Sequence, residues 1–117
     1  MQQIDPALVA RARSGDESAL AALIVRLMPA IRRGAARCTV PGLDFDDAVQ
    51  EGLIGLFDAV RHYDAGKGAA FAPYAAACIR HAQQDAARAS TRKKHTPGQR
   101  RAEHQRAAAG RFGHARP

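Results

Sequence analysis

Residues 46–64 read DDAVQEGLIGLFDAVRHYD, and this segment predicts a single amphipathic helix. Its large apolar side chains recur at i, i+4, i+7 and i+11 and therefore share one face: Val49, Leu53, Leu56 and Val60, widened by Ile54 and Phe57. Beside that face we expect an acidic, polar ridge made of Asp47, Gln50, Glu51 and Asp58. The segment thus predicts a helix with one surface for a core and another for solvent or a partner.

Two glycines, Gly52 and Gly55, lie inside this predicted helix. Each costs about 1 kcal/mol relative to alanine in a helix interior, so another interaction must offset them. We expect the cause to be close approach of another backbone, either a neighbouring helix or a partner protein.

The residues before this segment predict two helices, followed by a further segment after Pro29. Asp5 and Pro6 suit the start of a helix over 7–13, and Asp16 suits the cap of the next helix. The apolar stripe of that next helix is Leu20, Leu23, Ile24 and Leu27. Because Pro29 removes a backbone donor, we expect a break or kink at Met28 and a further segment over 30–38.

The central helix is bounded by a cap and a turn. Asp44 is placed to cap it, with Asp47 three residues later in a capping-box arrangement, and the helix should end near Tyr63. The glycine-rich residues 64–68 predict a turn, and a further helix should run from Pro73 to about Ser90. No segment alternates with the period of a strand, so we expect an all-α bundle of three to five helices.

The charge of the chain is divided unevenly between its two parts. Residues 1–87 carry 9 basic and 10 acidic residues, whereas residues 88–117 carry 9 basic residues and only Glu103. A chain of 117 residues suits one small domain, which we place at 1–98, followed by a basic and largely disordered tail at 99–117. Such a tail either contacts nucleic acid or another polyanion, or only promotes solubility.

Other classes of function find little support in the sequence. Cys38 and Cys78 are isolated and have no metal-ligand spacing, so we expect no metal and no cofactor. The five histidines do not converge with a nucleophile or an acid, and we expect no enzymatic activity. A signal peptide and a membrane-spanning run are both absent, which predicts a cytoplasmic protein that does not enter membranes.

The run DFDDAVQEGLIGLFDAVRHYDAGKGAAFAPYAAACIRHAQ, residues 44–83, resembles region 2 of bacterial sigma-70 family RNA polymerase sigma factors. The matching positions include Gln50-Glu51-Gly52, Gly55-Leu56, Tyr63-Asp64 and Tyr74-Ala75. The segment STRKKHTP, residues 90–97, resembles the end of that region in sporulation sigma-H factors. The resemblance covers about residues 5–98.

The resemblance implies two binding surfaces. The central helix would dock on the clamp helices of the β′ subunit of core RNA polymerase through Asp47, Gln50, Glu51, Leu53 and Phe57. The next helix would contact the −10 element of promoter DNA, and the basic residues after it would add contacts. The residues expected to bind DNA are Phe71, Tyr74, Arg80, His81, Gln84, Arg88, Arg92, Lys93 and Lys94.

The sequence departs from the family at two places. Housekeeping members carry a tryptophan pair where this chain has Ala77 and Cys78, which puts strand separation in doubt. Some 20 residues follow region 2, too few for the helix-turn-helix region 4 that reads the −35 element, so we expect region 4 to be lacking. A second protein would then supply region 4, as in a split sigma factor, or an anti-sigma factor would be the partner.

Three alternatives therefore remain open at the level of sequence. The chain is a nucleoid-associated transcription initiation factor, a sigma mimic that competes for polymerase without initiating, or a small basic DNA-binding module that works without polymerase. Promoter-dependent transcripts with core polymerase, competition with other sigma factors alone, and DNA affinity dominated by the tail distinguish them.

Overall fold

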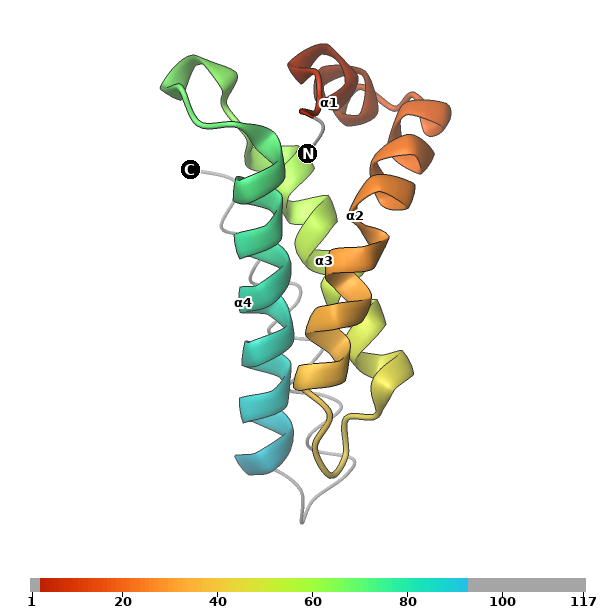
Figure 1. Ribbon diagram of the computed structural model, residues 1–117, viewed down its shortest axis with the longest axis vertical. Helices are drawn as coiled ribbons and strands as arrows, with labels where there is room; N and C mark the ends of the chain where they lie inside the picture. The colour runs from red at the N-terminus through yellow and green to blue at the C-terminus, as the bar shows by residue number, and fades with distance from the viewer. Residues whose placement is uncertain (1–2, 93–117) are drawn as a thin grey trace.

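The computed structural model describes residues 3–92, and these residues form four α-helices in the order α1, α2, α3 and α4. The helices span Pro6–Arg13, Glu17–Arg37, Phe45–His62 and Phe71–Arg92, with one short 3-10 turn at Ala65–Lys67. Figure 1 shows the three long helices side by side and α1 lying across one end of them. Within the described residues, the only β-type pairing is an isolated bridge between Val40 and Leu43. The predicted all-α bundle is confirmed.

Side-chain caps start the first three helices where the sequence predicts them. The Asp5 carboxylate accepts a hydrogen bond from the Ala7 amide, and Asp44 and Asp47 form a reciprocal capping box at the start of α3. Each cap satisfies backbone donors that have no partner inside the helix. Helix α4 begins at Phe71, two residues before the predicted start at Pro73.

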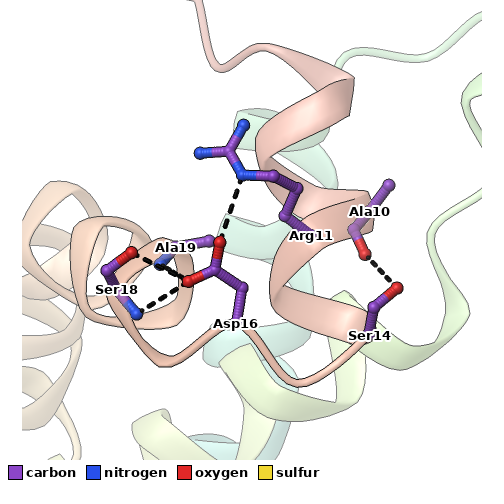
Figure 2. A network of polar contacts seen from close by, with 6 residues as sticks. All are labelled: Ala10, Arg11, Ser14, Asp16, Ser18 and Ala19. Atoms are coloured by element: carbon purple, nitrogen blue, oxygen red, sulfur yellow. Dashed lines mark hydrogen bonds and ion pairs between the residues drawn. The ribbon is translucent and has the colours of Figure 1, made fainter.

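The cap of α2 also connects it to α1 (Figure 2). One carboxylate oxygen of Asp16 accepts hydrogen bonds from the Ser18 amide at 3.0 Å, the Ser18 hydroxyl at 2.8 Å and the Ala19 amide at 3.2 Å. The other oxygen lies 3.3 Å from Nε of Arg11 on α1. The Ser18 hydroxyl and the other donors stabilise the carboxylate, so they lower the pKa of Asp16.

The predicted break at Met28 is not found, and the alternative of a kink at this position stays a prediction. Helix α2 continues through Pro29 without interruption. Pro29 lies on the solvent side, while Leu23 and Leu27 before it and Ile31 and Ala35 after it are buried along one line of the helix. Burial of that continuous stripe offsets the hydrogen bond that Pro29 cannot make.

The core lies between α2, α3 and α4. Its fully buried large side chains come from all three helices and include Leu23, Ile31, Leu56, Phe71 and Ile79. None of the helices among residues 3–92 has the combination of length and apolar character that crossing a membrane requires.

Candidate functional site

Helix α3 buries a face of small residues against its neighbours. Ala48, Gly52, Gly55 and Ala59 are all buried, together with Leu56 and Val60. A β-carbon added to Gly55 would lie 2.6 Å from the Cys78 carbonyl oxygen and 2.9 Å from the Ile79 α-carbon, both on α4. The glycine allows the two helix backbones to approach closely. A neighbouring helix, rather than an external partner, therefore explains Gly55.

Gly52 and Gly34 make room for one buried side chain, that of Gln83 on α4. An added β-carbon would lie 2.7 Å from Nε2 of Gln83 at Gly52 and 2.0 Å from its Oε1 at Gly34. Gln83 is fully buried, and its Nε2 donates to the carbonyl oxygens of Ile31 on α2 at 2.9 Å and Ala48 on α3 at 3.0 Å. One amide thus links the three long helices.

The opposite face of α3 carries large apolar side chains toward solvent. Ile54 and Phe57 are half-buried and lie outside both buried core clusters. Asp47 and Gln50 on the same side are exposed, and Leu53 is half-buried with part of its side chain packed on the core. We call Asp47, Gln50, Leu53, Ile54 and Phe57 the docking face. Ile54 is the member that the sequence did not single out, because the pattern assigned it to the core.

The sequence-based placement of Glu51 on an exposed ridge is wrong. Its side chain is only 3% exposed. Ala48 and Gly55, at i−3 and i+4, share its side of the helix and are themselves buried. Glu51 therefore lies at the edge of the small-residue face that packs against the neighbouring helices. The structure keeps Asp47 and Gln50 exposed and brings Glu51 into the interior.

The outer face of α4 carries a row of polar side chains. Five residues of the expected DNA-binding set are exposed there: Arg80, His81, Gln84, Arg88 and Arg92. An ion pair joins Arg88 to Asp85 within this row, so one of the cations is already partly neutralised. Lys93, Lys94 and the basic tail at 99–117 lie outside the described residues.

The placement of Phe71 as a DNA contact is also wrong, because its side chain is fully buried. Its ring packs edge-on against Tyr63, with ring centroids 5.1 Å apart. Tyr63 in turn lies 5.8 Å from the half-buried ring of Tyr74, and its hydroxyl donates to the Ala69 carbonyl oxygen at 2.6 Å. Phe71 therefore supports Tyr74 from inside the fold instead of reaching a ligand.

Burial sets the protonation of the polar groups next to this aromatic cluster. It raises the pKa of the Tyr74 hydroxyl, and the neighbouring Cys78 raises it further. Burial likewise raises the pKa of the Cys78 thiol, although its hydrogen bond with Tyr74 acts in the other direction. Both groups are neutral near pH 7, so this part of the surface offers an aromatic ring and a thiol rather than a charge. In the described part of the chain, no cluster of three or more His, Cys, Asp or Glu residues is suited to hold a metal ion.

The comparisons with known proteins agree with this arrangement. The family described as Sigma-70 region 2 matches residues 23–93, which contain most of α2 and all of α3 and α4. The chain is 33% identical over 93 residues to RNA polymerase sigma-H factor of Bacillus subtilis (strain 168), covering 80% of this chain and 43% of that protein. It is 43% identical over 63 residues to RNA polymerase sigma factor FliA of Escherichia coli (strain K12), covering 51% of this chain and 26% of that protein.

The chain thus spans less than half the length of the curated relatives that it matches. No solved structure matches it.

Proposed function

The chain belongs to the sigma-70 region 2 family, and from this premise we propose that it is a transcription factor that binds core RNA polymerase through the docking face of α3 and promoter DNA through α4. The observation that carries the proposal is the position of Ile54 and Phe57. Two large apolar side chains point away from the core on a helix whose other side is fully packed. Apolar groups rimmed by exposed polar ones, here Asp47 and Gln50, are typical of protein-binding sites.

The β′ clamp helices are the part of polymerase that we propose as the receptor for this face. The family resemblance implies that receptor, and the charge of α3 suits a basic partner surface because Asp44, Asp46 and Asp47 are all exposed at its first turn. Glu51 has no place in this contact surface, since its side chain is buried. A lysine at that position would test the stability of the fold rather than polymerase binding.

We propose that α4 contacts the −10 element. Its exposed row of Arg80, His81, Gln84 and Arg92 offers donors to phosphates and base edges. Tyr74 supplies a half-exposed ring held by Tyr63, and stacking of an unpaired base on such a ring contributes about 1–3 kcal/mol. A protein with this role would act where the bacterial chromosome is transcribed, either with a second protein that supplies region 4 or under an anti-sigma factor.

Retention of the protein on immobilised core RNA polymerase tests the docking face. We expect Phe57→Ala to weaken binding by roughly 30-fold, because truncating a central aromatic side chain of an interface commonly costs about 2 kcal/mol or more. Val25→Ala is the matched control, since Val25 is 73% exposed on α2 and lies outside the docking face. Gln50→Lys should weaken binding as well, whereas Gln84→Lys on α4 should not. Equal retention of the parent, Phe57→Ala and Gln50→Lys would refute the proposed surface.

Transcription in vitro separates an initiation factor from a sigma mimic. Both would compete with another sigma factor for core polymerase. Only an initiation factor, alone or with the second protein, yields transcripts that depend on a promoter sequence. Competition without such transcripts would assign the chain to the mimic class while leaving the docking face intact.

A further inference from the structure

We propose that the outer face of α2 is a second nucleic-acid surface, which binds the phosphate backbone of duplex DNA without regard to base sequence. Its binding groups are Arg26, Arg33 and Arg37, which we call the arginine row. This surface differs from both the docking face of α3 and the polar row of α4.

The geometry of α2 aligns the three guanidinium groups. Residues at i, i+7 and i+11 of an α-helix fall within an arc of roughly 40° and extend over about 16 Å along the axis. Arg26, Arg33 and Arg37 have this spacing and are all exposed. Three cations in a line of this length can reach several phosphates of one groove edge together.

The one acidic residue of α2, Glu17, lies nine positions before Arg26, so no negative charge of this helix lies beside the arginine row. The sequence contains no acidic residue between Glu17 and Asp44. Of the ion pairs among residues 3–92, none involves Arg26, Arg33 or Arg37. Arg32 differs, because its guanidinium lies 5.9 Å from the ring centroid of Phe45, and we leave it out of the row. An ordinary solvent-exposed helix face mixes both signs of charge, whereas this one carries a single sign.

The side chains around the arginine row favour a phosphate backbone over a protein partner. Ala22, Ala30 and Ala36 flank the row, so the arginines are the groups that protrude. A protein interface needs an apolar centre, and the most exposed large apolar side chain of α2, Val25, which is 73% exposed, lies to one side of the row. A polyanion needs only charge and close access, and the planar guanidinium group donates two hydrogen bonds to one phosphate.

The arginine row also faces away from the rest of the bundle. The buried stripe of α2, which includes Leu23, Leu27, Ile31 and Ala35, packs into the core on another side of the helix, whereas the three arginines are exposed. In Figure 1, α2 lies to the right of α4, and the two are separate helices of the bundle. The arginine row and the polar row of α4 therefore belong to different helices.

The test is DNA binding by the full chain without polymerase, measured by fluorescence anisotropy on a labelled duplex over a range of salt concentrations. The variant is Arg26→Gln/Arg33→Gln/Arg37→Gln, which keeps good helix-forming residues at exposed positions. Since each phosphate contact contributes about 0.9 to the slope of log K against log salt, the slope should become shallower by about 2 to 3. The loss of affinity should be the same for a −10-like duplex and for a duplex of scrambled sequence.

The control is Arg11→Gln/Arg61→Gln/Lys67→Gln, which removes the same net charge from exposed positions elsewhere on the fold. Both variants should keep the helical circular dichroism of the parent. The inference is overturned if the two triple variants shift the slope equally, since net charge would then explain the effect. It is also overturned if the arginine-row variant keeps the parent slope but loses retention on polymerase, since the row would then bind an acidic protein surface. Because the assay contains no polymerase, its outcome is independent of the docking face of α3.

Discussion

Gln83 is a buried polar residue that links the three long helices. Its amide nitrogen donates to carbonyl oxygens of two different helices, and two glycines give its side chain the space that it occupies. The carbonyl oxygens of Ile31 and Ala48 belong to helix interiors, so the contact fixes the height of α4 relative to α2 and α3. A hydrogen bond of this kind contributes only about 1 kcal/mol, but a mismatch at a buried site costs several times more. The residue therefore acts mainly by excluding other registers of the three helices.

The substitution Gln83→Glu should destabilise the fold by several kcal/mol at about pH 7, because a buried carboxylate can accept but cannot donate to the two carbonyl oxygens. Burial raises the pKa of the introduced carboxyl above its unfolded value of about 4.3. The penalty is therefore smaller below that value, where both states hold the proton and the carboxyl can donate to one of the two carbonyl oxygens, and it grows as pH rises through it. Urea unfolding of the parent and the variant at about pH 4 and pH 7 measures this difference. A penalty that is equal at the two pH values would contradict the donor role.

The burial of Glu51 and Gln83 was not predicted from the sequence. The period of large apolar residues placed Glu51 on a polar ridge beside the apolar face, and the prediction did not place Gln83 in the core, although both side chains are buried. The contact face of α3 consists mainly of alanine and glycine, which carry a weak hydrophobic signal although they allow the closest helix packing. One signal was available, because Gln83 lies at i+4 from Ile79 and i−3 from Ala86, two apolar residues of the last predicted helix.

Among the elements, α2 differs most from its prediction. The rule that proline ends a helix depends on local geometry, and Pro29 does lack the amide that would donate to the preceding turn. The stripe on the other side of the helix decides the outcome, because its residues before and after Pro29 enter one core. Helix starts were predictable because the caps of Asp5, Asp16 and Asp44 are local chemistry. The continuity of α2 through Pro29 was not predictable, because it depends on contacts with α3 and α4.

The substitution Pro29→Ala should stabilise the protein by about 1–3 kcal/mol, because it restores a donor to the middle of α2 and removes a steric conflict with the preceding turn. Pro73→Ala is the matched control. Pro73 is also exposed, but it is the third residue of α4, where an amide has no partner within the helix. Thermal unfolding should therefore show a clear rise in Tm for Pro29→Ala and little change for Pro73→Ala. Equal shifts would mean that the helix has adapted fully to its proline.

At the scale of the whole molecule, α1 is joined to the bundle by hydrogen bonds from Arg13 to residues at the end of α3, far away in the sequence. Nε of Arg13 donates to the Val60 carbonyl oxygen at 2.8 Å, and Nη2 donates to the Tyr63 carbonyl oxygen at 2.5 Å. These acceptors are at the end of α3, where carbonyl groups have no partner within the helix and where a cation interacts favourably with the helix dipole. Tyr63 also packs against Phe71 and Tyr74, so this contact connects α1 with the aromatic end of α4.

The substitution Arg13→Lys should lower the free energy of unfolding by about 1–2 kcal/mol, because a single ammonium group does not reproduce the two-point donation of the guanidinium group. Arg11→Lys is the matched control on the same helix, since the ion pair of Arg11 with Asp16 is exposed and such pairs contribute little. Hydrogen exchange locates the effect within the molecule. Amides of α1 and of the last turn of α3 should lose protection in Arg13→Lys, while those around Gln83 should keep it. Loss of protection throughout the bundle would instead mean that α1 and the three long helices unfold as one cooperative unit, with Arg13 part of the core that holds them together.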